Sequence, residues 1–384
     1  MSSVVARDSH VEPGWGPVAD AFRANFDEHG DVGAACCVYL DGRPVVDLWG
    51  GVADPAGPRP WTRETIVIMF SCTKGVTAIA ANQLVEQGRL DPDAPVSRYW
   101  PEFAANGKAA ITVGMVMSHR AGLAAIDGDL TLDDIAAWHP VVEAIAAQAP
   151  NWEPGTQHGY HSRSFGWIVG ELIRRVTGQM PGEYIAEALA GPLHLDLLLG
   201  VPAAEDHRVA TLIPDPEAAS LTAFAAADPT SLFARVMTGP SGLLHYDEAW
   251  NTRRLRAAQL PSSNGHSDAR SLARLYAACL GPVDGVRVLS EAAVDAATHV
   301  RSTGADCVLG QPLTFGLGFS LPPTLPPGAG PRAFGHAGAG GSLGYADRDR
   351  GLALGYVMNQ MRLGFSGEDP RSTLLSAAAA RCAG

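Results

Sequence analysis

Lysine is scarce in this chain of 384 residues: 26 of the 28 basic positions are arginine, and only Lys74 and Lys108 are lysine. Arginine serves wherever a site needs positive charge alone, but its guanidinium stays protonated and cannot act as a base. Each lysine therefore needs its own explanation. Because lysine is seldom buried, we expect Lys108 to be an exposed charge in a loop. Lys74 lies in a different setting, described below.

Long apolar runs and blocks of positive charge are also missing. No run of 18 or more apolar residues occurs, so no membrane helix is predicted. The first 14 residues lack the apolar run of a secretory signal, which favours a cytoplasmic location. The net charge is −12 without a basic cluster, which argues against nucleic acid as a partner. A globular protein acting on a small molecule is expected, and its oligomeric state is left open.

The six cysteines show neither a CxxC pair nor zinc-ligand spacing. In a cytoplasmic protein such cysteines are expected to be reduced and structural, so no disulfide framework is predicted. No carboxylate cluster accompanies His158 and His161, which we interpret as loop residues. The sequence therefore predicts neither a metal nor another cofactor.

The order of β-type and helical patterns predicts a mixed α/β fold. Two β-type runs flank Asp41-Gly42, a pair typical of a tight hairpin turn. Further strands are predicted at 65–70, 315–321, 333–336, 342–346 and 352–358, and the clearest helices at 163–177, 269–280 and 371–382.

Both ends of the chain contribute strands to this pattern, whereas its middle is helical. We therefore expect an antiparallel sheet flanked by helices, built from residues 1–75 and 282–384. A mostly helical domain, residues 76–281, would be inserted between them, with a cleft at the junction.

Ser71 and Lys74 are the first candidates for chemistry. They lie where a short β-type run meets a helix that ends before Gly88, and side chains three residues apart share one helix face. A helix N-terminus and an enclosed cleft both disfavour a cation, which would lower the pKa of the Lys74 amine. A neutral amine could then take the proton of the serine hydroxyl.

Two further polar signatures follow in the chain. Tyr160 and Ser162 lie on a constrained loop before the helix at 163–177, and His336 and Gly338 lie at the end of a predicted strand. Glycines near Gly338 would let a substrate lie against the strand backbone.

In this order, Ser-x-x-Lys (Ser71, Lys74), Tyr-x-Ser (Tyr160, Ser162) and His-x-Gly (His336, Gly338) resemble the serine β-lactamase and penicillin-binding superfamily. The nearest branch is similar to the class C β-lactamase-like carboxylesterases of family VIII. The segment Met117–Leu123, Ser-His-Arg-Ala-Gly within it, supports the resemblance, which covers roughly residues 15–384.

The resemblance implies an acyl-enzyme mechanism without a cofactor. Ser71 would be the nucleophile, Lys74 and Tyr160 the proton-transfer pair, and the backbone N–H groups of Ser71 and Ala339 the oxyanion hole. Which member of the pair is the base stays open. The remaining residues expected to line the substrate site are Ser162, Asn264, His336 and Gly338.

Two departures from the family pattern bear on the substrate. Penicillin-binding enzymes usually have Asn where this chain has Ser162 and Lys where it has His336. A mostly neutral histidine does not supply the permanent cation that holds the carboxylate of a β-lactam. The sequence therefore favours a carboxylesterase acting on small or short-acyl esters. The alternatives are an acyltransferase, a weak β-lactamase and, from another class, a non-catalytic binding protein.

Other polar residues have simpler interpretations. The Gly-x-Ser-x-Gly motif around Ser342 lacks the following helix and the later histidine of an α/β-hydrolase, so Ser342 is interpreted as a strand residue. Cys72 would point about 100° away from Ser71 on the helix and is expected to pack in the core. We expect His119 to form hydrogen bonds at a helix end, whereas His336 is open between a structural and a substrate-contacting role.

Overall fold

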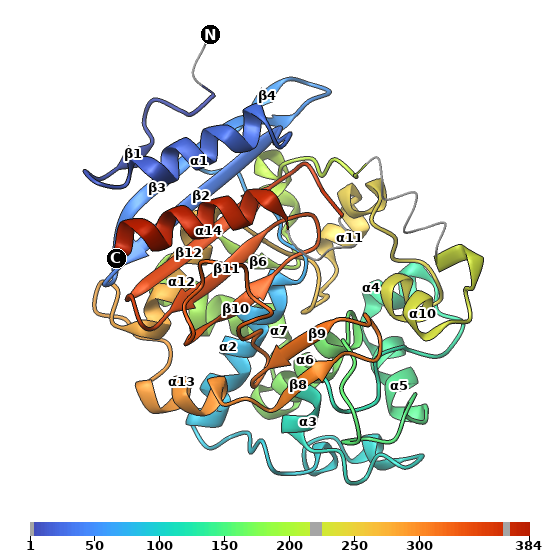
Figure 1. Cartoon of the computed structure of the whole chain (residues 1–384). Coiled ribbons are helices and arrows are strands. Elements are labelled where there is room, and N and C mark those ends of the chain that lie inside the picture. The colour runs from blue at the N-terminus through green and yellow to red at the C-terminus, as the bar shows by residue number, and fades with distance from the viewer. Residues whose placement is uncertain (1–3, 216–224, 364–368) are drawn as a thin grey trace.

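The computed structural model describes residues 4–215, 225–363 and 369–384. Its main feature is an antiparallel sheet in the order β1-β3-β2-β12-β11-β10, with β4 paired to β3 (Figure 1). Its strands are β1 (His10–Val11), β2 (Gly33–Leu40), β3 (Arg43–Asp54), β4 (Arg59–Pro60), β10 (Ala333–Ala337), β11 (Leu343–Asp347) and β12 (Leu352–Met358). Because β12 lies between β2 and β11, both ends of the chain share one sheet, which confirms the predicted mixed α/β fold.

The hairpin between β2 and β3 is the one predicted from Asp41-Gly42. Both residues have positive φ angles, 48° and 77°. A two-residue turn of this kind matches the twist of the strands that it joins. The local sequence therefore explains the first register of the sheet, in which Leu40 pairs with Arg43.

Helices cover both faces of the sheet. On one face lie α1 (Gly16–Asp27) and α14 (Pro370–Ala383), which bury Phe22 and Leu375 in a core against the strands (Figure 1). On the other face, α12 (Ala269–Leu280) packs against β2, β11 and β12. Beside it, α2 (Cys72–Glu86) contacts β10 with one part of its surface and α6 (Ser164–Thr177) with another.

The middle of the chain is mostly helical and loop-rich. Its shorter helices are α3 (Val113–Met117), α4 (Leu132–Ala137), α5 (His139–Ala147), α7 (Pro181–Ile185), α8 (Gly191–Leu193), α10 (Leu232–Thr238) and α11 (Arg253–Ala257), and α13 (Glu291–Thr298) follows α12. Two small sheets complete the fold: β5 (Val67–Ile68), β7 (Gly265–Ser267) and β6 (Leu197–Leu199) form one, and β8 (Ser302–Ala305) and β9 (Pro312–Phe315) form the other.

Two local predictions need correction. The strand expected at 315–321 ends at Phe315, since the chain bends at Gly316 and at Gly318, whose φ is +81°. β9 pairs with β8, and the predicted segment meets the main sheet at Ser320, which forms an antiparallel bridge with Gly335 of β10. The helix α12 was expected within the helical segment 76–281, but it packs on the main sheet. The division into two domains itself stays a prediction.

Lys108 is also placed differently from the prediction, because its side chain is fully buried. Its Nζ donates to the backbone carbonyls of Ala105, at 2.8 Å, and Gln148. Burial lowers the pKa of this amine. Lys108 is thus a structural link between two loops rather than an exposed charge.

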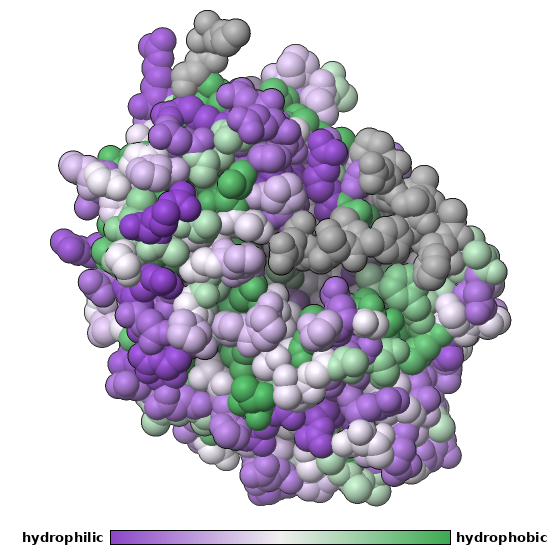
Figure 2. Space-filling view, in the orientation of Figure 1, coloured by the Kyte–Doolittle hydropathy of each residue, from purple (hydrophilic) through white to green (hydrophobic). Residues whose placement is uncertain are grey.

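The outer surface offers little apolar area. Among the described residues, Val300 and Leu374 are the large hydrophobic side chains that are exposed. The face seen in Figure 2 is largely hydrophilic, with hydrophobic residues scattered between. No helix in the described ranges has the length and apolar character needed to cross a membrane.

Candidate active site

Ser71 stands at the N-terminal end of α2, as predicted, and its side chain meets two polar groups. Its Oγ lies 3.0 Å from Lys74 Nζ and accepts a hydrogen bond of 2.9 Å from the Tyr160 hydroxyl. The Lys74 Nζ also lies 4.9 Å from the centre of the Tyr160 ring. The structure therefore brings together a hydroxyl, an amine and a phenol that the sequence separates by up to 89 residues.

The turn before Ser71 is strained. Phe70 has a φ of +41°, a left-handed conformation that bulky residues rarely adopt. Its ring is held by edge-to-face contacts with Tyr246 and Trp250, at 5.5 and 5.4 Å between centroids. Strain of this kind typically costs about 1–3 kcal/mol and persists only where the surroundings enforce it. Here the packing fixes the direction in which the helix and Ser71 begin.

The electrostatics of Lys74 suit a base. Its side chain is fully buried, and burial together with the positive charge of Arg163 holds the pKa of the amine well below its usual value. Its Nζ donates to the Ser262 carbonyl at 3.0 Å. A neutral amine can donate there and still accept the Ser71 proton.

The pKa of Tyr160 is shifted in the opposite direction to that of Lys74. Burial raises the pKa of its phenol above the usual value, and this outweighs the effect of its hydrogen bond to Ser71. Tyr160 is therefore a neutral phenol near pH 7 that can donate a proton. The two groups beside Ser71 are matched as an acceptor and a donor.

The segment around Gly338 lies directly against the chain that leads into Ser71. The Ser342 hydroxyl donates to the Met69 carbonyl at 2.9 Å, and the Cys72 thiol donates to the His336 carbonyl at 3.1 Å. A Cβ on Gly338 would lie 2.2 Å from the Met69 carbonyl oxygen, so only glycine fits there. Ser342 and Cys72 are thus structural, in line with their interpretation from the sequence.

The predicted oxyanion hole has free donors. Within the described ranges, neither the N–H of Ser71 nor that of Ala339 donates to another group of the protein. Both belong to the two segments that Ser342 and Cys72 hold together. Their availability is what an oxyanion site requires.

His336 and Asn264 are both buried but differ in what they can reach. The His336 Nδ1 donates to the Ala337 carbonyl at 2.6 Å, and its Nε2 has no partner among the described residues. Burial and the nearby Lys74 lower the pKa of His336 to about 3, so the ring is neutral. The Asn264 side chain binds the backbone of Leu255, Ala258 and Leu260 and has no polar atom left for a substrate.

Ser162 is buried next to the tyrosine loop. Its backbone N–H donates to the Tyr160 carbonyl at 3.0 Å, which closes the turn. The two neighbouring histidines support the same loop: His161 binds the Gly159 carbonyl and the Leu123 N–H, and His158 lies 4.0 Å from Asp306. No three potential metal ligands gather among the described side chains.

Arg163 and Ser262 were not recognised from the sequence. Arg163 is buried, and its guanidinium donates to the Ser263 hydroxyl at 2.8 Å. The guanidinium also stacks on the rings of Tyr246 and Trp250. Its positive charge lowers the pKa of Lys74. The signal that could have found it is its position next to the Tyr-x-Ser motif. Ser262 contributes a backbone carbonyl, which no sequence pattern marks.

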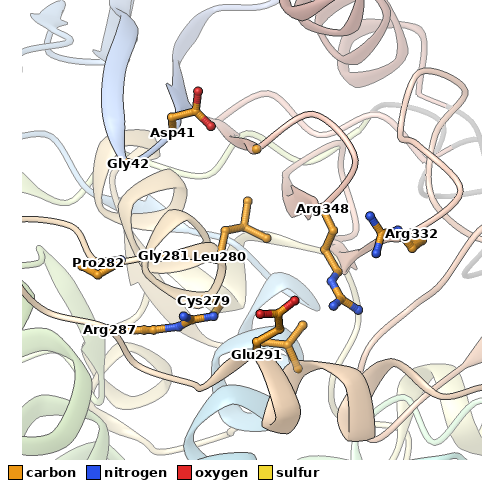
Figure 3. Close-up of a pocket in the computed structure, with 12 residues that line it drawn as sticks. Asp41, Gly42, Cys279, Leu280, Gly281, Pro282, Arg287, Glu291, Arg332 and Arg348 are labelled. Carbon is orange, nitrogen blue, oxygen red and sulfur yellow. The ribbon is translucent and has the colours of Figure 1, made fainter.

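Two cavities lie near these elements. One, of about 680 Å³, is bounded by residues 337–342 and by the apolar side chains of Leu313, Leu325 and Leu363, and thus reaches Ala339. The other, of about 380 Å³, lies between α12, α13 and the β11–β12 turn (Figure 3). Arg332 and Arg348 on its wall are paired with aspartates, and no serine, histidine or lysine lines it. Ser71, Lys74 and Tyr160 line neither cavity, and the larger one meets the predicted site at Gly338 and Ala339.

Comparison with known proteins finds relatives over nearly the whole chain. Residues 18–379 match the Beta-lactamase family. The chain is 38% identical to the "Esterase/beta-lactamase LipL" of Mycobacterium tuberculosis over 360 residues, which cover 91% of this chain and 82% of that protein.

Two solved structures are similar over almost their whole length. A crystal structure of a family VIII carboxylesterase has a TM-score of 0.85 and 37% identity, with 98% of this chain and 99% of that chain covered. EstA from Arthrobacter nitroguajacolicus Rue61a has a TM-score of 0.87 and 33% identity, with 98% of each chain covered.

Proposed function

The chain belongs to the beta-lactamase family and is a serine hydrolase, and from this premise we propose that it is a carboxylesterase with Ser71 as its nucleophile. The observation that carries the proposal is the position of Ser71 Oγ, 3.0 Å from the amine of Lys74 and 2.9 Å from the phenol of Tyr160. The names of its relatives, an esterase/beta-lactamase and a family VIII carboxylesterase, support the ester bond as the target.

Acylation begins with Lys74 as the base. Its neutral amine takes the Ser71 proton while Oγ forms a bond to the carbonyl carbon of the ester. The negative charge that develops on the carbonyl oxygen is held by the N–H groups of Ser71 and Ala339. When the carbon–oxygen bond to the alcohol breaks, the leaving oxygen takes the proton of Tyr160, and Lys74 returns its proton to the phenol.

Deacylation repeats these steps with water. Water loses a proton to Lys74 and attacks the acyl carbon. When the bond to Ser71 Oγ breaks, the acid is released, Oγ takes the proton of Tyr160, and Lys74 returns its proton to the phenol. An alcohol or amine in place of water would give acyl transfer. Added alcohol in the assay, with the products separated, distinguishes the two outcomes.

Neutral esters suit the site better than β-lactams. A β-lactam carries a carboxylate, and His336, at the position where penicillin-binding enzymes usually have lysine, is uncharged. We expect faster turnover of a nitrophenyl ester than of a chromogenic cephalosporin. A cytoplasmic location, as expected from the sequence, stays a prediction.

Labelling tests the assignment of the nucleophile. We expect a fluorophosphonate to add to Ser71, which mass spectrometry would locate, and Ser71→Ala to abolish both labelling and ester turnover. Ser290→Ala, at the start of α13 and outside the proposed site, is the matched control and should be labelled at Ser71 and turn over ester like the parent. Labelling at another serine, or full turnover in Ser71→Ala, would refute the proposal.

A further inference from the structure

We propose that His119 is a positioning residue that holds Tyr160 against Ser71, an inference that rests on the function proposed above. His119 is buried, follows α3 and is far from Tyr160 in the sequence. It touches neither Ser71 nor Lys74 through any hydrogen bond in the described structure. Its contacts instead surround the tyrosine loop.

Both neighbours of Tyr160 in the chain are bound to His119. The N–H of Gly159 donates to the His119 carbonyl at 3.0 Å, and the N–H of His161 donates to its Nδ1 at 3.1 Å. One residue therefore fixes the backbone immediately before and immediately after the tyrosine. A shift of either hydrogen bond would move the Tyr160 Cα and, with it, the hydroxyl.

The His119 ring also packs on the Tyr160 ring. Their centroids are 5.1 Å apart, and Phe315 lies 4.4 Å from the histidine ring in an edge-to-face arrangement. Phe315 is in turn stacked on Tyr160, with centroids 6.3 Å apart and planes 17° apart. The phenol is thus confined by two rings that contact each other, while its backbone is held at two points.

The conformation of His119 is specific to this role. Its φ is +61°, in the left-handed region where histidine and asparagine are enriched among non-glycine residues. In this conformation its carbonyl and its ring serve the same loop. Burial, chiefly, keeps the pKa of His119 well below its usual value, so the ring is neutral. Because the His161 N–H donates to Nδ1, this nitrogen is the acceptor of the ring.

Four single variants and one double variant test the proposal: His119→Leu, His119→Asn, His119→Gln, Tyr160→Phe, and His119→Leu combined with Tyr160→Phe. The readouts are the acylation rate constant with nitrophenyl acetate, the rate of fluorophosphonate labelling and thermal unfolding. We expect His119→Leu to slow acylation about 10- to 100-fold, since a misplacement of about 1 Å in a catalytic group has effects of this size.

The conservative variants separate positioning from packing. The Asn oxygen can accept from the His161 N–H, and asparagine tolerates the positive φ, so His119→Asn should keep acylation within a few-fold of the parent. The Gln amide reaches the Nε2 position instead, so His119→Gln should resemble His119→Leu. Gln takes the place of Leu in the cycle if His119→Leu fails to fold.

The double variant shows whether His119 acts on acylation through Tyr160. If His119 acts through Tyr160, then His119→Leu should change acylation less than about twofold in the Tyr160→Phe background. Val18→Ala in α1, on the far face of the sheet, controls for lost stability and should leave acylation unchanged.

The role of His119 would be overturned if His119→Leu slowed acylation equally in the parent and in the Tyr160→Phe background. It would also be overturned if His119→Asn slowed acylation as much as His119→Leu. Either result would leave the proposed esterase function intact. Unchanged acylation in Tyr160→Phe would instead contradict the role of Tyr160 itself and the positioning role with it.

Discussion

The two lysines of this chain occupy two buried places that resemble each other closely. Both side chains are fully buried, and burial lowers the pKa of both amines. The Lys108 amine donates its hydrogen bonds to the backbone carbonyls of Ala105 and Gln148. Lys74 has one carbonyl partner, Ser262, and one hydroxyl partner, Ser71.

The difference between them is the chemistry of the partner. A carbonyl oxygen has no proton to give, so a neutral amine beside two carbonyls can only donate. A hydroxyl has a proton, and an amine that is kept neutral can accept it. Burial and a lowered pKa alone therefore do not identify a base, and the partner decides between a structural and a reactive lysine.

The largest expected effect comes from removing the amine of the active site. Lys74→Met should lower kcat for a nitrophenyl ester by about 10²–10⁴-fold, the usual range for a general base. Lys74→Arg should lose as much, because guanidinium cannot give up its proton. The corresponding Lys108→Met and Lys108→Arg variants should keep kcat within about twofold of the parent, and a loss of equal size in both series would erase the distinction.

The pH dependence is the next test. Lys74 must be unprotonated to accept a proton, so kcat/KM should fall as the pH drops through its lowered pKa and reach a plateau below the usual pKa of lysine. The pKa of His336 is about 3 and that of His161 about 4, so neither produces a limb near neutral pH. Lys108→Met should have the same profile as the parent. A limb that rises only near pH 10 would contradict a depressed pKa.

A smaller shift should follow from changing Arg163. Its charge contributes to the low pKa of Lys74, so Arg163→Met should raise that pKa and move the acid limb of kcat/KM to higher pH. Arg163→Lys retains a cation and should preserve more of the parent profile. An unmoved limb in Arg163→Met would mean that burial alone sets the pKa of Lys74.

The smallest effect on activity and a measurable effect on stability are expected at Lys108. Lys108→Met leaves the buried Gln148 carbonyl without its donor, which should lower the free energy of unfolding by about 1–3 kcal/mol. Denaturant unfolding measures this, with Lys108→Arg as the variant that keeps donors. An unchanged unfolding free energy would show that the link between the two loops is dispensable.

Local patterns in the sequence predicted the structural features that depend on residues close together in the chain. Asp41-Gly42 indicated the hairpin, and the spacing of Ser71 and Lys74 placed both on the first turn of a helix. The family resemblance implied the partnership with Tyr160, and the structure puts the two hydroxyls 2.9 Å apart.

Most of what the sequence did not predict depends on contacts between distant segments. Lys108 is buried, and its amine donates to the carbonyl of Gln148, 40 residues later. Asn264 uses its amide on its own loop, although its position in a motif suggested the pocket. Arg163 reaches Lys74 through space without a shared motif. The placements of Lys108 and Arg163 follow from how separate elements pack, although Arg163 adjoins the Tyr-x-Ser motif. The bonds of Asn264 lie within nine residues of it, and no motif marks them.

The place of β12 in the sheet has a consequence for the chain during its synthesis on the ribosome. This strand is the last one among the described residues, yet it lies between β2 and β11. While the ribosome is still making the C-terminal third, the early hairpin has an open edge where β12 will pair, and such edges favour aggregation. Ala339 and its neighbours are also not yet in place beside Ser71. The nascent chain therefore lacks both the complete sheet and the complete reactive centre until its final strands are synthesised.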